Sequence, residues 1–177
     1  MIAKGPPPLA RLLVFSALLS LATFFSPFPA RSESAPRDGG KSGLVARFMS
    51  LRSDRINLRV GPGTTYPILW VLTRKGMPVE VLREFDNWWM IRDPEGDKGW
   101  VEDSMVTPAR TVLVTGAIRP LRATPDPRSP IRARAEPGVV ARLLACSGAW
   151  CEIRASGISG WVKRGEIWGV FPGETVK

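Results

Sequence analysis

Residues 88–101 read WWMIRDPEGDKGWV, and residues 150–162 repeat the pattern as WCEIRASGISGWV. Each stretch begins with a tryptophan three positions before an Ile-Arg pair and ends on a Gly-Trp-Val triplet. Short apolar segments on either side of a turn-forming segment are typical of a β-hairpin. The sequence therefore predicts the same hairpin twice.

The repeat continues on the N-terminal side of both hairpins. Matching positions are 61 to 63 residues apart along the chain, and a spacing this constant indicates a duplicated module. The matched segments are Leu58-Arg59 with Leu121-Arg122, Pro67-Ile68 with Pro130-Ile131, Gly76 with Gly138, Trp88 with Trp150, and Gly99-Trp100-Val101 with Gly160-Trp161-Val162. We predict one domain over residues 47–108 and a second over residues 109–173.

Each unit has the pattern of short strands joined by turns. Residues 56–60 alternate apolar and polar, which is the period of a half-buried strand. Residues 61–67 are crowded with turn formers, and a further bend is expected at Asp86-Asn87. The chain contains 17 glycines and 17 prolines, too many helix breakers for long helices. We predict an all-β protein made of two small barrels or sandwiches.

The second copy departs from the first at its start, where Thr124–Ser129 replaces the Gly-Pro-Gly-Thr-Thr-Tyr loop. Between the copies, Thr111–Val114 has the composition of a strand and not of a loose linker. A unit of about 60 residues buries too little surface to be very stable alone. We therefore expect the copies to pack closely or to use a covalent staple.

Residues 1–34 have the pattern of a secretory signal peptide, with Lys4 and Arg11 before a short apolar run and small residues after it. The run is shorter than the roughly 20 residues of a membrane-spanning helix. We expect cleavage, with no stable membrane insertion afterwards and a periplasmic or secreted product. The alternative is an uncleaved anchor. The candidate cleavage positions follow Ala30, Ser32 and Ser34.

Residues 35–46 lack an apolar face and are expected to form a flexible tether. After residue 34 the chain carries 22 basic and 15 acidic side chains, a net charge of +7. Such a surface attracts anionic partners, although a basic surface without a dedicated partner has the same composition. Nucleic acid is not expected as a partner, because the chain has an export signal and no recognition motif.

The composition argues against an enzyme. The chain contains no histidine, which is the commonest general base and the commonest metal ligand. Two cysteines without histidine do not complete a tetrahedral zinc site, so we expect no metal and no cofactor. A glycosidase needs only two carboxylates, but the candidates fall mostly in expected turns and on solvent faces. These candidates are Asp54, Glu80, Asp86, Glu95 and Glu102.

Cys146 and Cys151 enclose Ser-Gly-Ala-Trp in the expected second hairpin. A bend at Ser147-Gly148 brings the two side chains close together on paired strands. Export places them in an oxidising compartment, so we predict a structural disulfide between them.

The first copy resembles the bacterial SH3 (SH3b) family. The motifs that carry the resemblance are Asn57-Leu58-Arg59, Gly61-Pro62, Tyr66-Pro67, Lys75-Gly76, Trp88 and Gly99-Trp100-Val101. More narrowly, residues 45–173 resemble exported SH3-like proteins of proteobacteria with two tandem copies. The resemblance implies two tandem SH3-like barrels of five to six strands and a binding or targeting role, often at the cell wall.

The resemblance places a ligand groove between the loop at residues 61–66 and the hairpin at residues 86–89. Tyr66, Trp88 and Arg59 are the expected ligand-binding residues, with Asp86 as a polar partner, because aromatic faces stack on sugars and peptides. Trp88 and Trp150 also recur as a pair, which equally suits a packing role.

We therefore expect a non-catalytic module that binds peptidoglycan or its stem peptides. The alternative is a protein–protein assembly module of the cell envelope, which docks its partner by a groove or by strand addition.

Overall fold

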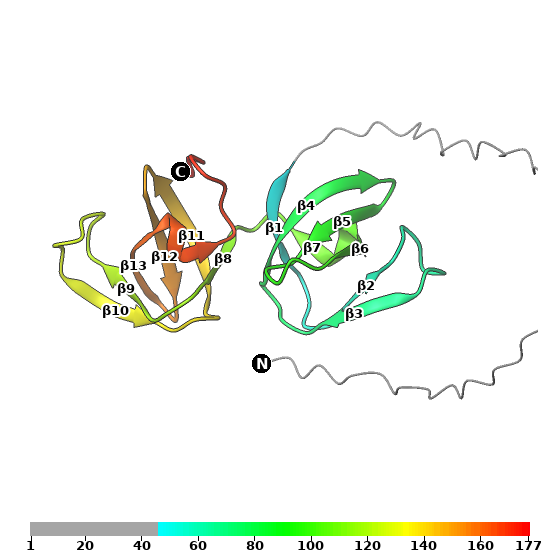
Figure 1. Cartoon of the computed structure of the whole chain (residues 1–177), viewed down its shortest axis with the longest axis horizontal. Coiled ribbons are helices and arrows are strands. Elements are labelled where there is room, and N and C mark those ends of the chain that lie inside the picture. The colour runs from blue at the N-terminus through cyan, green and yellow to red at the C-terminus, as the bar shows by residue number, and fades with distance from the viewer. Residues whose placement is uncertain (1–45) are drawn as a thin grey trace, which may run out of the picture. The chain divides into compact units, whose positions relative to one another are not determined.

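The computed structural model describes residues 46–177 (Figure 1), and the signal-peptide and tether predictions for residues 1–45 lie outside this range. Two seven-stranded antiparallel sheets make up the described part of the chain. Its only helical segments are two single 3-10 turns, so the predicted all-β fold is confirmed. No helix within these residues is long and apolar enough to span a membrane.

The first sheet uses residues 47–107 in the strand order β3-β2-β6-β5-β4-β1-β7. A 3-10 helix, η1 (Asp103–Met105), precedes its last strand. The strands are β1 (Arg47–Leu51), β2 (Ile56–Arg59), β3 (Ile68–Leu72), β4 (Pro78–Phe85), β5 (Trp88–Arg92), β6 (Lys98–Glu102) and β7 (Val106–Thr107). The expected bend at Asp86-Asn87 is present, because Phe85 and Trp88 are register partners.

The second sheet repeats this arrangement in the order β10-β9-β13-β12-β11-β8-β14. Each label in this order is seven higher than its counterpart in the first sheet, so both sheets have one topology, and the predicted duplication is confirmed. The strands are β8 (Thr111–Val114), β9 (Arg119–Arg122), β10 (Ile131–Ala135), β11 (Val140–Ser147), β12 (Trp150–Ala155), β13 (Ile158–Lys163) and β14 (Ile167–Trp168), with η2 (Arg164–Glu166) before the last.

Each sheet encloses its own hydrophobic core. The inward positions of the repeat are occupied by equivalent residues in both copies, and burial of these side chains provides most of the driving force for folding. Three equivalent pairs are at most 1% exposed: Leu58 with Leu121, Ile91 with Ile153, and Val101 with Val162. Trp100 is also buried, whereas its counterpart Trp161 is half-buried.

The glycine of the repeated Gly-Trp-Val triplet is required by close packing between strands. A Cβ on Gly99 would lie 2.6 Å from Cγ of Leu58, and one on Gly160 would lie 2.8 Å from Cβ of Leu121. In each copy a strand therefore approaches the backbone and core leucine of its neighbour at a distance that only glycine permits.

The two copies contact each other through a small aromatic cluster and a polar contact. The ring of Phe48 in β1 is buried, and its centroid lies 4.9 Å from the ring centroid of Trp168 and 4.6 Å from that of Phe171. Nearby, the hydroxyl groups of Ser50 and Thr111 are 2.6 Å apart. Thr111 lies in β8, so the predicted strand at Thr111–Val114 is present, and it is the first strand of the second copy.

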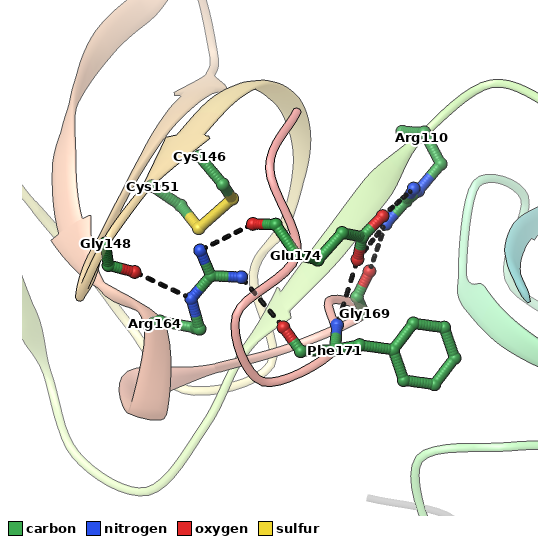
Figure 2. The surroundings of a disulfide bond; sticks show 8 residues. All are labelled: Arg110, Cys146, Gly148, Cys151, Arg164, Gly169, Phe171 and Glu174. Atoms are coloured by element: carbon green, nitrogen blue, oxygen red, sulfur yellow. Dashed lines mark hydrogen bonds and ion pairs between the residues drawn. A yellow bond between two sulfur atoms is a disulfide. The ribbon is translucent and has the colours of Figure 1, made fainter. Parts of the chain in front are cut away.

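The predicted disulfide joins Cys146 and Cys151, which are register partners on β11 and β12 (Figure 2). The bend lies at residues 148–149, one position later than expected, because Ser147 is still paired with Trp150. Gly148 has a φ of +55°, which glycine adopts without strain. The backbone of Cys146 also pairs with that of Val176, and this pairing attaches the C-terminal segment to the sheet.

Candidate functional site

A surface pocket of approximately 140 Å³ lies on the first copy, where β2, the loop after it, the start of β5 and the end of β6 come together. Its lining residues are Arg55, Ile56, Asn57, Arg59, Thr64, Trp88, Glu102 and Met105. Asn57 and Arg59 from the start of the family motif therefore meet Trp88 here, although they are about 30 positions apart in the sequence.

Strand alternation explains why β2 supplies the polar side chains of this pocket. Ile56 and Leu58 are buried in the core, so Arg55, Asn57 and Arg59 point away from it. This alternation is visible in the sequence, and it could have identified Arg55 and Asn57, which the sequence analysis did not select.

Trp88 and Glu102 form the opposite wall of the pocket. They are register partners on β5 and β6, so their side chains lie on the same face of the sheet. Trp88 is only 8% exposed and can therefore present little more than a ring edge to a ligand. Its counterpart Trp150 is half-buried. Trp88 therefore packs against the core and also forms part of the pocket wall.

Arg59 holds the loop that follows its own strand. Its Nη1 donates a hydrogen bond to the carbonyl oxygen of Tyr66 at 2.7 Å. In the second copy, Arg122 donates in the same way to the carbonyl oxygen of Ser129, also at 2.7 Å. Because the contact recurs with a different loop sequence, part of the role of Arg59 is structural.

Tyr66 packs against the glycines of its loop and does not line the pocket. A Cβ on Gly61 would lie 2.5 Å from Cδ1 of Tyr66, and one on Gly63 would lie 3.3 Å from Cδ2. The ring is 45% exposed, so it remains accessible on the outer side of the loop. The glycines of the motif thus make room for the ring of Tyr66.

Asp86 occupies the exposed β4–β5 turn and also lies outside the lining residues. Its φ is +50°, and the equivalent turn position in the second copy is Gly148 with a φ of +55°. Aspartate tolerates this left-handed conformation better than most residues, which gives Asp86 a conformational role. Of the four predicted residues, the pocket brings together Arg59 and Trp88.

The polar groups of the pocket are suited to recognition by hydrogen bonding. Arg55 and Arg59 are cationic, Glu102 is anionic, and Asn57 and Thr64 can both donate and accept hydrogen bonds. Thr64 could not be found by strand alternation, because it lies in the irregular loop. Within residues 46–177 no three His, Cys, Asp or Glu side chains are grouped closely enough to hold a metal ion.

Burial raises the pKa of Asp93 despite a hydrogen bond from the backbone amide of Asp97. Asp93 follows β5 and closes the turn before β6, away from the lining residues of the pocket. The raised pKa of Asp93 is therefore a property of this turn and not of the pocket.

The second copy has different side chains at the positions of the pocket. By the repeat spacing, Asn57 corresponds to Pro120, Glu102 to Lys163 and Met105 to Glu166. Proline removes the amide side chain, and lysine reverses the charge of the wall. The chemistry of this pocket is therefore specific to the first copy.

The topology and the pocket define the class as a tandem pair of SH3-like β domains. The family model described as "Bacterial SH3 domain" matches residues 52–108 and again residues 116–169. The chain belongs to the bacterial SH3 domain family.

A curated relative from Bacillus subtilis (strain 168) has the name "Putative N-acetylmuramoyl-L-alanine amidase YrvJ". It is 26% identical to this chain over an alignment of 123 residues, and the match covers 63% of this chain and 24% of the relative. The chain thus spans about a quarter of the length of the relative that it matches.

Two solved structures from Trichomonas vaginalis, those of NlpC2 and NlpC1, are also similar. Each is 10% identical and covers 72% of this chain, with 49% and 47% of the solved chains covered and TM-scores of 0.33 and 0.32. Similarity at this level supports no inference about this chain.

Proposed function

We propose that this chain is a non-catalytic, periplasmic or secreted binding module for peptidoglycan or its stem peptides. The observation that carries the proposal is the polar pocket of the first copy, whose lining includes Asn57, Arg59 and Trp88 of the family motif. The name of the Bacillus subtilis relative, "Putative N-acetylmuramoyl-L-alanine amidase YrvJ", supports the same class of ligand.

The chemistry of the pocket suits a short peptide that carries carboxylates. Asn57 and Thr64 can bond to peptide amides or sugar hydroxyls, and the exposed edge of Trp88 offers apolar contact. Arg55 and Arg59 can pair with carboxylates of the stem peptide, because a guanidinium group binds a carboxylate with two parallel hydrogen bonds.

A binding role fits the pocket better than a catalytic role. The chain contains no histidine, and Glu102 is the single acid among the lining residues. Glycoside hydrolysis requires two carboxyl groups on either side of the scissile bond. The pocket therefore holds the groups that recognise a glycopeptide without a pair that would cleave it.

A pull-down on purified sacculi tests the proposal. We expect the protein without residues 1–34 to sediment with sacculi, and the double variant Asn57→Ala, Thr64→Ala to be retained at least fivefold less. Both side chains are exposed, so their removal leaves the core intact.

The matched control is the double variant Asn87→Ala, Thr65→Ala. It removes the same two residue types from exposed positions outside the pocket lining, and its retention should stay within twofold of the unaltered protein. Equal retention of the pocket variant and the control would refute the pocket as the binding site.

The alternative, a protein–protein assembly module of the envelope, is favoured by one feature of the first sheet. Strand β3 stands at the edge of the sheet, and within the described residues it pairs with β2 alone. Its residues Ile68, Leu69 and Val71 are each more than 40% exposed. Such an edge can accept a strand from a partner. A protein that stays in the supernatant with sacculi at low salt would support this alternative.

A further inference from the structure

The basic charge of the protein is concentrated in its second copy. Residues 47–108 contain nine basic and nine acidic side chains, whereas residues 109–173 contain ten basic and four acidic ones, a net charge of +6. The two copies share a fold but present different electrostatic surfaces. An anionic ligand is therefore attracted mainly to the second copy.

The first copy contains an ion pair between adjacent strands. Glu80 in β4 and Arg92 in β5 are register partners, and Nε of Arg92 donates a hydrogen bond to Oε2 of Glu80 at 3.0 Å. Glu80 is only 5% exposed, so its carboxylate depends on this arginine for compensation.

In the second copy, the same two positions hold Arg142 in β11 and Arg154 in β12, again as register partners. Both arginines are exposed, and no described residue forms a hydrogen bond or an ion pair with either side chain. Like charges directly opposite each other on a sheet are destabilising. The second copy thus has a cation, Arg142, where the first copy has the buried carboxylate of Glu80.

A third arginine lies next to this pair. Nη1 of Arg132 in β10 donates a hydrogen bond, 3.4 Å long, to the carbonyl oxygen of Ser159, and Ser159 is the register partner of Arg154 on β13. Glu152 lies on the same face of β12 as Arg154, but no ion pair joins it to the arginines.

We propose that Arg142 and Arg154 form a binding site for a carboxylate group of an anionic polymer. The first copy supports this proposal, because there the carboxylate of Glu80 accepts a hydrogen bond from Arg92, the residue equivalent to Arg154. Guanidinium groups hold carboxylates by charge-assisted hydrogen bonds that neutral ligands cannot make. A bound carboxylate would also relieve the repulsion between the two arginines.

The spacing of the cations favours a polymer over a single small ion. Neighbouring strands are about 4.8 Å apart, so the positions of Arg142, Arg154 and Ser159 span roughly 10 Å. A chain with several carboxylates can reach this row of cations at more than one point. The site lies on the second copy and is independent of the pocket proposed above.

Binding of hexaglutamate tests the proposal, with isothermal titration calorimetry at low salt as the measurement. Arg142→Glu recreates the arrangement of the first copy, in which an internal carboxylate faces the arginine of the next strand. We expect this variant to bind hexaglutamate at least tenfold more weakly. It should be at least as stable as the unaltered protein in thermal unfolding, because the repulsion between the two arginines is removed.

Arg128→Glu is the matched control, because it makes the same change of charge at an exposed position in the loop between β9 and β10. Its affinity should fall by no more than twofold. Two results would each overturn the proposal: no binding of hexaglutamate, whether or not inorganic polyphosphate binds, or an equal loss in both variants. Because this assay contains no sacculi, its result is separate from the test of the pocket.

Discussion

At the scale of single residues, each position of the family motif has an identifiable physical task. Gly61 and Gly63 make room for the ring of Tyr66, Arg59 holds a loop carbonyl, and Gly99 allows two strands to approach. The second copy keeps the arginine contact and the close approach, although its loop sequence differs. The contacts shared by both copies are those that the barrel itself requires.

The first prediction concerns the glycine of the Gly-Trp-Val triplet. Gly99→Ala should lower the free energy of unfolding by about 1–3 kcal/mol, since the added methyl group would overlap Leu58 and overpacking has a cost of this order. Urea denaturation followed by tryptophan fluorescence measures the change. Gly165→Ala is the control, because a Cβ there meets no heavy atom within 4 Å. Equal stability of both variants would contradict the packing argument.

At the scale of elements, the C-terminal segment after β14 is tied down by two arginines (Figure 2). Arg164 donates to the carbonyl oxygens of Gly148, Phe171 and Glu174 at 3.0, 2.8 and 2.7 Å. Arg110 forms a two-pronged ion pair with the carboxylate of Glu174. These contacts fix the segment against the disulfide hairpin without adding a full strand to the sheet.

The environment of Glu174 gives this segment a pH dependence. Burial by itself would raise the pKa of Glu174, but hydrogen bonds from the Arg110 side chain and the Phe171 amide, together with the charges of Arg110 and Arg164, outweigh it and lower the pKa. A carboxyl group with a lowered pKa in the folded state stabilises the fold above its ordinary pKa of 4.5. That stabilisation is lost as the pH falls below this value.

We predict that Glu174→Gln lowers the free energy of unfolding by about 1–2 kcal/mol at pH 7. A hydrogen bond to a charged group is worth about 1.5–3 kcal/mol, whereas the neutral amide keeps about 0.5–1.5 kcal/mol. The difference from the unaltered protein should shrink as the pH falls below 4.5, because the unfolded chain then binds a proton at Glu174 more readily than the folded protein does. Urea titrations at several pH values measure it. The exposed Glu136→Gln serves as the control, and a difference that is constant with pH would contradict the assignment.

At the scale of the whole molecule, the two copies share one topology and have diverged on their surfaces. The first carries the polar pocket and an apolar edge strand, whereas the second carries the arginine pair. Leu69 and Val71 of β3 correspond to Arg132 and Arg134 of β10, so the edge of the second sheet carries charges that disfavour strand addition. The two copies therefore present different surfaces on one repeated fold.

Contact between the copies leads to a prediction about unfolding. Phe48→Ala removes the ring that packs against Trp168 and Phe171, and truncation of a buried phenylalanine costs about 3–5 kcal/mol. We expect one calorimetric transition for the unaltered protein and two for this variant. Phe85→Ala, which removes an exposed ring from the same sheet, should keep a single transition. A single transition for Phe48→Ala as well would show that the copies are coupled elsewhere.

The sequence by itself determined the duplication, the strands, the disulfide and the family, because these depend on local spacing. Alternation and turn residues specify strands over a few positions, and the spacing of 61 to 63 residues relates the copies directly. Arg59 and Trp88, which line the pocket, were expected at a ligand groove because of the resemblance to the bacterial SH3 family. Arg55 and Asn57 could also have been predicted from the sequence, since they alternate with buried residues of the same strand.

Only the tertiary structure decided which of these residues meet. Strand register placed Glu102 opposite Trp88, and it set Arg142 opposite Arg154 where the first copy has an ion pair. It also left Tyr66 and Asp86 outside the pocket lining. The physical reason is that pairing between strands joins residues far apart in the chain, and a shift of one residue in the register would turn every side chain of a strand to the opposite face of the sheet.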